Sequence, residues 1–523
     1  MSRRAGLLAT LAIATGARAA HWLLYLSYPP AAVHYWPVLG AMRFETSALQ
    51  MLAGTPQTGP LVYASPLYRH LILPFYALGS GRTPLLVFQT IVGIVTAAAI
   101  YTLCFHLVRK TWLSLLIAAC WSLYPPVLFY ELTVLPVSIA ALTLLVISVL
   151  LMDWKQKQGL VRCCALGLLI GLAAGMRPPF IALALPAAYA VLRERARWAS
   201  RLGRTCCLLL CAGLPLLPTA LHQSRNWSGF YPFPRATGLT LILGHNDDAT
   251  GFGPPAPSVG LVESGIEDLR SVSLRVAAEH GANSPVLADR YWTRLALQWI
   301  ARNPGRELGL LLGKAGAFFG LEPFDVYYDL GRLGRSNPLF RFLVIPRGLL
   351  VALFCIGLVP FLAWWGRPQH RLALGGPALL VLLSSLVFVH SERYSLPILP
   401  QMLLLGGCGV AALLQRLRAS GETVPGARLG TICVAASGLL LMVPALLRPV
   451  PEVAEGGYFY TLGASAFSMG DAELALTLFE RSALVSPEGS HYRLIAHESA
   501  AVVARSLGRE DEARAHEELA GLR

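Results

Sequence analysis

The sequence alternates between apolar runs of about 20 residues and short polar turns, and a run of that length suits a helix that crosses a membrane. This pattern predicts eleven membrane-spanning helices, at 6–27, 84–107, 112–130, 133–153, 161–176, 179–193, 204–222, 343–365, 372–390, 395–415 and 428–447. The first run is interpreted as an uncleaved span, because no convincing signal-peptide cleavage site precedes His21. We therefore expect an α-helical polytopic membrane protein.

Basic residues gather at every second turn between these runs. With the N-terminus placed inside, the predicted cytoplasmic turns hold Arg3, Arg4, Arg109, Lys110, Lys155, Lys157, Arg162, Arg193, Arg195, Arg197, Arg201, Arg204, Arg367, Arg371, Arg416, Arg418 and Arg428. The alternate turns at 124–132, 177–178 and 391–394 hold only Arg177 and Arg393. This positive-inside pattern predicts a multi-pass protein of the bacterial inner (cytoplasmic) membrane with a periplasmic C-terminus.

Three longer segments fall on the predicted periplasmic side. They are a first loop at 28–83, a large loop at 223–342 and a tail at 448–523, so the predicted membrane domain is 1–447. In the large loop, residues 284–300 read as a helix capped by Ser284. Residues 308–319 are apolar but too short to span, and we expect them along the membrane surface.

The first loop has two interpretations. Residues 42–52 show helical spacing, and Gly54 and Pro56 end the pattern. An aromatic and proline-rich run from Tyr63 to Tyr68 follows, as is common at a bilayer surface. The loop is either an amphipathic helix held on the membrane beside a substrate cleft, or an ordinary loop with interfacial aromatic residues.

The tail has a different character, because beyond Pro451 the charge density rises and the apolar runs end. Its small and large residues match the tetratricopeptide pattern, in which two helices cross closely. The matching positions are Leu462, Gly463, Ala475, Phe479 and Pro487, with Gly508 and Ala513 in a weaker second unit. Two units are fewer than normally stand alone, so we expect the tail to pack on the chain or on a protein partner.

Composition agrees with a membrane protein. Of 523 residues 55% are hydrophobic and 14% are charged, against about 25% charged in a soluble domain. The net charge of +14 comes from the basic turns and does not indicate a nucleic-acid partner. All ten cysteines lie in apolar runs, so we expect neither disulfides nor a zinc site.

Charges close to a membrane are costly and often functional. On the predicted outer face lie the acid Glu131, the arginines Arg177 and Arg393, and Lys314 with Glu322 close behind it. Three cations suit a phosphate or diphosphate, which arginine grips with two donors and lysine binds as a point charge. The structural alternative is that the two arginines snorkel or pair with acids.

These features together resemble the GT-C glycosyltransferases, and within them the bacterial relatives of protein mannosyltransferases and the lipid A aminoarabinose transferase. The matching pieces are Tyr63-Ala64-Ser65-Pro66-Leu67-Tyr68, Tyr124-Pro125-Pro126 with Glu131, Gly175-Met176-Arg177-Pro178, Gly244-His245-Asn246-Asp247, Lys314, Glu322 and Arg393-Tyr394-Ser395-Leu396-Pro397. The resemblance covers roughly 1–447, and many such proteins also end in tetratricopeptide repeats.

The resemblance implies transfer of a sugar, with inversion, from a polyprenyl-phosphate donor to an acceptor hydroxyl on a glycan, lipid or protein. Arg177, Lys314 and Arg393 would hold the donor phosphate, so that no metal or other cofactor is required. Glu45 or Glu131 would be the catalytic base. The substrate-binding residues implied are Tyr68, His245, Asn246, Asp247, Glu322 and Tyr394.

The chain departs from the family at one position. The family usually has a catalytic aspartate just before the amphipathic helix, and Gly40 stands in its place. Glu45, one helical turn further on, substitutes if it reaches the acceptor. Otherwise the chain is a degenerate transferase that serves as a membrane scaffold, or it is a lipid-linked sugar carrier, and the repeats recruit partners.

Overall fold

In the computed structural model the chain is almost entirely helical. The residues described are 2–27, 40–54, 66–79, 81–154, 159–194, 196–227, 230–233, 236–250, 256–261, 269–325, 328, 330–331, 333, 337–342, 345–364, 368–419, 432–434, 436–443, 455–488 and 490–521. Within these ranges the only β-type pairing is an isolated bridge between Ala256 and Leu261.

Six helical stretches in the described part of the chain are long and apolar enough to cross a membrane. They are α1 (Arg3–Ser27), α5 (Thr83–Val108), Trp198–Leu221, α19 (Arg347–Trp364), α20 (Pro368–Val387) and Glu392–Arg418. Trp198–Leu221 joins α11 (Trp198–Gly213), η3 (Leu214–Leu216) and the start of α12 (Leu217–Trp227). Glu392–Arg418 joins α21 (Glu392–Ser395), η5 (Leu396–Ile398) and α22 (Leu399–Ala419). The chain is an α-helical membrane protein, as the sequence predicts.

The span expected at 112–130 is bent. Its two parts, α6 (Thr111–Ser122) and α7 (Pro125–Glu131), meet at 53°. Tyr124 between them has extended backbone angles, because a residue before a proline avoids the helical region. Counted as one span, this pair would be a seventh.

Shorter apolar helices occupy the remaining predicted spans. They are α8 (Val137–Met152), α9 (Leu160–Met176), η2 (Pro178–Leu183) with α10 (Ala184–Leu192), and the stretch Ile432–Met442. The 16 residues of α8 extend about 24 Å, which is less than the roughly 30 Å of a hydrocarbon core. The count of eleven spans therefore stays a prediction.

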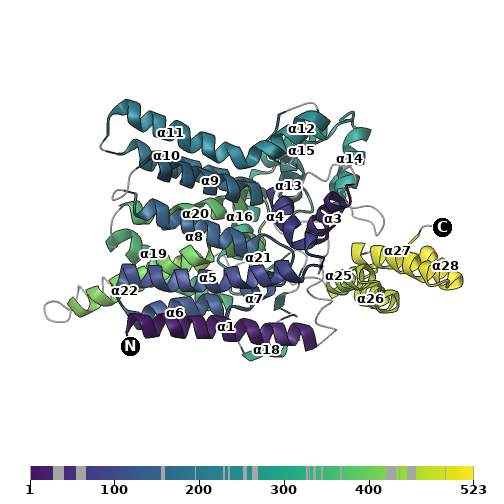
Figure 1. The fold of residues 1–523 in the computed structure, drawn as a ribbon. Helices are drawn as coiled ribbons and strands as arrows, with labels where there is room; N and C mark the ends of the chain where they lie inside the picture. Colours follow the sequence, from purple (N-terminus) through teal and green to yellow (C-terminus); the bar gives the residue numbers. More distant parts are fainter. Residues whose placement is uncertain are drawn as a thin grey trace.

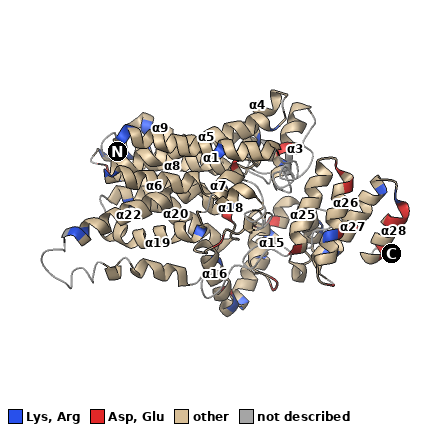
Figure 2. Ribbon diagram, turned by 90° about the horizontal axis from the view of Figure 1, so that it is seen from below, with Lys and Arg blue, Asp and Glu red and all other residues tan. Residues whose placement is uncertain are grey.

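The long helices lie side by side in one bundle (Figure 1). The N-terminus is at one end of this bundle, and the polar loops and the tail are at the other. Seen from below, basic residues mark the end with the N-terminus, and most acidic residues lie toward the opposite end (Figure 2). This arrangement places the first loop, the large loop and the tail together, which we call the loop end of the bundle.

Small residues allow α19 and α22 to cross closely in the bundle. A Cβ atom on Gly409 would overlap the backbone of Gly357, and one on Gly406 would contact Leu353. Glycine at such crossings is typical of membrane helices, because it lets two backbones approach. The crossing fixes where α22 and the residues just before it lie.

At the loop end, short helices cover the bundle. The first loop provides α3 (Gly40–Leu52) and α4 (Pro66–Ala77), so the helix predicted at 42–52 is confirmed, while Tyr63 lies outside the described residues. The large loop provides α13 (Thr237–Gly244), α14 (Leu269–Glu279), α15 (Pro285–Arg302), α16 (Pro304–Phe318) and α18 (Pro338–Phe342). The predicted cap is also confirmed, because the Ser284 hydroxyl accepts a hydrogen bond from the Leu287 amide.

The tail consists of two helix pairs with a core of their own. The helices are α25 (Glu455–Ser468), α26 (Ala472–Val485), α27 (His491–Ser506) and α28 (Glu510–Leu519). The buried Phe479 ring packs against Gly463, and Asp471 caps α26. Two consecutive helix pairs agree with the repeat pattern, and the tetratricopeptide assignment itself stays a proposal.

Replacing Gly463 with alanine should lower the stability of the tail by about 1–3 kcal/mol, as overpacking of a filled core does. The reason is that a Cβ there would lie 2.8 Å from two carbons of the buried Phe479 ring. Amide hydrogen exchange of α25 and α26 in the full chain measures this opening free energy. Thr477→Ala, on the exposed face of α26, is the control, and equal protection in both variants would contradict the packing role.

Candidate functional site

Two arginines and a tyrosine meet near the loop end of the bundle, and we call Arg177, Arg393 and Tyr394 the arginine–tyrosine cluster. Arg177 follows the last residue of α9 and has extended backbone angles, as Pro178 after it requires. Arg393 and Tyr394 belong to the short helix α21. Residues 216 positions apart in the sequence are thereby brought into contact.

Both guanidinium groups lie over the Tyr394 ring. The central carbon of Arg177 is 4.7 Å from the ring centroid and that of Arg393 is 5.2 Å away, within cation–π range. Arg177 Nη2 donates to the Arg393 carbonyl oxygen at 2.5 Å. The buried Nε of Arg177 has no hydrogen-bond partner within the described residues. Within the described residues, the cluster thus contains one buried donor without an acceptor.

Beneath the cluster lies Asp325, which is fully buried. Its Oδ2 accepts hydrogen bonds from the Tyr130 hydroxyl at 2.6 Å and the Ser391 hydroxyl at 2.7 Å, and lies 3.8 Å from Arg393 Nε. Among the described residues, one carboxylate thus lies beside the two guanidinium groups. Burial is the main factor that lowers the pKa of Arg177, to about 10, and the neighbouring Arg393 adds to it, so Arg177 is still charged at pH 7.

Lys314 belongs to a separate group with His245 and Glu307. Its ammonium lies 3.2 Å from His245 Nε2 and donates to the Leu386 carbonyl at 3.1 Å. His245 Nδ1 is 2.8 Å from the Glu307 carboxylate. Burial lowers the pKa of Lys314 to about 8, although Glu307 acts in the opposite direction. No hydrogen bond or ion pair in the described residues joins Lys314 to the arginine–tyrosine cluster.

The neighbours of His245 have mainly structural contacts. Asn246 donates to the Ile242 carbonyl at the end of α13, and its own side-chain oxygen accepts from the Asp248 amide. Asp247 is exposed and accepts hydrogen bonds from Trp299 and Arg306. These two polar side chains therefore organise the turn after α13.

Tyr68 is also fully buried, and its hydroxyl donates to Gln89 on α5 at 3.1 Å. Its ring contacts Phe44 of α3 edge-on, with centroids 5.0 Å apart. Tyr68 therefore holds α3 and α4 on the bundle. Glu322, by contrast, is exposed to solvent near the C-terminal end of α16.

Glu45 projects from α3 and keeps 16% of its side-chain surface exposed. Its carboxylate accepts a hydrogen bond from the Tyr76 hydroxyl at 3.0 Å and lies 3.6 Å from Arg82 Nε. Leu67 of the adjoining α4 packs against Gly175, at the position that a Cβ atom would occupy. Gly175 is two residues before Arg177. The first loop thus covers the part of the bundle from which Arg177 emerges.

Glu131 lies elsewhere than expected. The sequence places it in an outer turn, but it is 1% exposed inside the bundle, where Arg18 of α1 pairs with it at 2.6 Å. The bend between α6 and α7 turns this residue inward. Gly93 of α5 makes room for the pair, because a Cβ there would overlap both side chains. Glu131 is thus placed to hold α1, α5 and α7 together.

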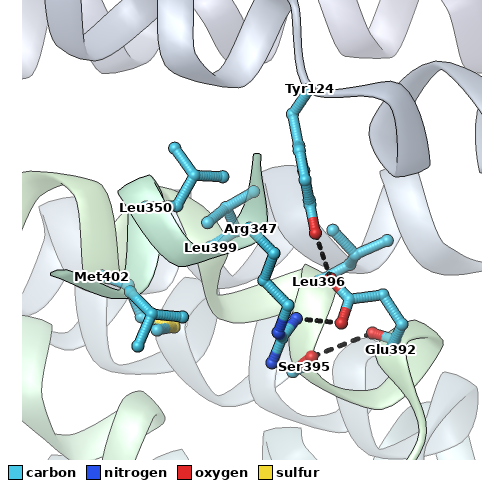
Figure 3. Close-up of a pocket in the computed structure, with 9 residues that line it drawn as sticks. Tyr124, Arg347, Leu350, Glu392, Ser395, Leu396, Leu399 and Met402 are labelled. Carbon is cyan, nitrogen blue, oxygen red and sulfur yellow. Dashed lines mark hydrogen bonds and ion pairs between the residues drawn. The ribbon is translucent and has the colours of Figure 1, made fainter. Parts of the chain in front are cut away.

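A second buried network, which sequence reasoning missed, lies beside the cluster (Figure 3). Arg347, the first residue of α19, forms an ion pair with Glu392, and the Tyr124 hydroxyl donates to the same carboxylate at 2.9 Å. Apolar side chains, among them Leu350 and Met402, complete a pocket there of about 20 Å³. That volume holds about one water molecule, so this network is structural and not a substrate pocket.

In comparisons with known proteins, neither a protein-family model nor a curated protein matches the chain. The resemblance to GT-C glycosyltransferases therefore stays an expectation from the sequence motifs alone.

Proposed function

We propose that the protein is a membrane glycosyltransferase that moves a sugar from a polyprenyl-phosphate donor to an acceptor hydroxyl. The observation that carries this proposal is the arginine–tyrosine cluster. At the loop end of the bundle it combines two cations, one carboxylate beside them and a buried Arg177 donor without an acceptor among the described residues. A phosphate monoester or diester supplies the anionic oxygens that such donors bind.

In this proposal the donor phosphate lies against Arg177 and Arg393, and the polyprenyl chain lies among the apolar helices. Charge builds up on the phosphate as the bond to the sugar breaks, and two fixed guanidinium groups stabilise that charge. Lys314 and His245 form a distinct polar group, so we assign them to the acceptor side and not to the donor phosphate.

The acceptor needs a base, and Glu45 is the acid that the first loop provides. Its carboxylate takes the proton from the acceptor hydroxyl, and the hydroxyl oxygen forms a bond to the anomeric carbon. The bond from that carbon to the donor oxygen breaks, and the polyprenyl phosphate leaves with the electron pair, so the configuration inverts. The guanidinium of Arg82 lies 3.6 Å from this carboxylate and the Tyr76 hydroxyl donates to it, so both neighbours hold Glu45 in place.

The proposed reaction takes place on the periplasmic face of the bacterial inner membrane. This placement follows from the basic turns, which gather at the end of the bundle with the N-terminus (Figure 2). Alkaline phosphatase fused after the last residue should then be active, because the tail lies at the loop end (Figure 1). An inactive phosphatase together with a fluorescent cytoplasmic reporter at the same position would contradict this orientation.

Arg177→Ala should weaken binding of a polyprenyl-phosphate analogue by about 10- to 150-fold, which corresponds to the loss of one charge-assisted hydrogen bond of roughly 1.5–3 kcal/mol. Binding to the purified protein in detergent micelles measures this change. Arg275→Ala is the matched control, because that arginine lies on α14 with 54% of its side-chain surface exposed. Equal affinities in the two variants would remove Arg177 from the donor site.

A scaffold or sugar-carrier function is the second candidate. Two observations favour it: Gly40 stands at the first residue of α3, and Glu131 is held by Arg18. The helix pairs of the tail would then recruit a protein partner. Gain of sugar transfer by Gly40→Asp, from a wild type with no detectable transfer, would favour this second function.

A further inference from the structure

The last helix of the tail brings a histidine and two glutamates together. Glu512 and His516 lie one turn apart on α28, and both face Glu480 of α26. The two carboxylates and the imidazole each offer one ligand atom, and these atoms all lie within 4.8 Å of one another. The three side chains thus converge from two helices that belong to different helix pairs.

Their spacing is close to that of a metal site. Two ligands of a tetrahedral ion with bonds of about 2.0–2.1 Å are about 3.3 Å apart. His516 Nε2 and Glu480 Oε1 are 3.7 Å apart, and all three ligand atoms lie within 4.8 Å of one another, so the side chains have to close by about 1 Å around an ion. Both glutamates are partly exposed, with 46% and 34% of their side-chain surface accessible, so an ion can enter from solvent.

A second histidine is placed to orient the first. His497 Nδ1 on α27 lies 3.0 Å from His516 Nδ1, so one of these two nitrogens donates a proton and the other accepts it. When His516 donates, its Nε2 carries a lone pair directed at the two carboxylates. Ligating histidines commonly have such an outer partner.

The neighbouring charges leave the site acidic. Arg509 lies 3.6 Å from Glu512 but also pairs with Glu473 at 2.7 Å. Its charge is shared between these two carboxylates, so it neutralises Glu512 only in part. A lone pair on His516 beside two carboxylates is unfavourable unless a cation lies among them. That cation is either a proton on Nε2 or a metal ion.

We propose that Glu480, Glu512 and His516 bind a divalent transition-metal ion of the zinc class, with His497 as a positioning residue. Water completes the coordination. The ion would fasten α28 to α26 and so join the two described helix pairs of the tail. The expectation of no zinc site was based on the cysteines, and this site contains no cysteine.

The test uses the full chain in detergent micelles, purified with a histidine-free tag and stripped with a chelator. Calorimetric titration should show that the wild type binds Zn²⁺. In His516→Gln and Glu480→Gln the affinity for Zn²⁺ should be lower by more than about 100-fold. His497→Phe should lower affinity by about 10- to 100-fold, as loss of an outer partner does. Glu518→Gln is the matched control, because Glu518 is exposed on the same helix.

A second readout does not depend on affinity alone. Zn²⁺ should slow amide exchange in α28 of the wild type and leave it unchanged in His516→Gln. Equal Zn²⁺ binding in the wild type and all variants would overturn the proposal. So would slowing of exchange by acid alone, with no response to Zn²⁺, because the site would then bind only a proton.

Discussion

Replacing Arg347 by methionine should lower the free energy of unfolding by about 3–5 kcal/mol, the usual cost of removing one partner from a buried ion pair. The Glu392 carboxylate, 1% exposed, would then lose its ion-pair partner and keep only hydrogen bonds with neutral groups such as the Tyr124 hydroxyl. Arg347 also donates to the carbonyl oxygens of Phe318 and Gly320 after α16, and both would lose this donor. The variant therefore loosens α16, α19 and α21 together.

The double variant Arg347→Met/Glu392→Met separates the charge from the packing. Because it removes both charges, it should recover much of the lost stability, as apolar replacements of buried pairs often do. Equilibrium unfolding in mixed micelles measures all three proteins, with Arg275→Met as an exposed control. A single variant within about 1 kcal/mol of the wild type would show that Arg347 and Glu392 are not a coupled buried pair.

The sequence predicts where most helices lie, because an apolar run long enough to span a membrane has no other stable conformation there. It does not predict their ends or bends. The run at 112–130 was predicted as a single span, although Pro125 and Pro126 lie inside it. The missing amide of a proline and the restriction on the residue before it produced the 53° bend instead.

The candidate site was predicted in part. Arg177 and Arg393 were expected on one face, because both follow predicted spans in outer turns, and the structure brings them to one tyrosine ring. Asp325 was missed because it follows no span and has no local pattern. Its partners Tyr130 and Ser391 are 195 and 66 positions away in the sequence.

Glu131 shows why a span boundary is a poor guide to exposure. Because it follows directly after the span predicted at 112–130, it was placed in an outer turn, but its partner Arg18 is 113 positions away. The pairing depends on three helices and on the absence of a side chain at Gly93. None of these contacts leaves a periodic signal in the sequence.

Glu45→Gln should lower sugar transfer by about 10²–10⁴-fold, the usual effect of removing a general base. Glutamine keeps a side-chain oxygen that accepts the hydrogen bond from Tyr76, so α3 should stay in place. Donor binding should stay nearly unchanged, since the proposed phosphate site is formed by Arg177 and Arg393. A lower transfer rate with unchanged donor affinity is expected for a group that acts on the acceptor and not on the donor.

The experiment compares transfer rate and donor affinity in wild type, Glu45→Gln and Glu279→Gln. Glu279 is a suitable control because it is an exposed acid on α14, another helix at the loop end, and it pairs only weakly with Arg275, at 3.3 Å. Full transfer activity in Glu45→Gln would exclude Glu45 as the base. The base would then have to come from another acid, and Glu131 could serve only if its ion pair with Arg18 opened during the reaction, because that pair buries both side chains.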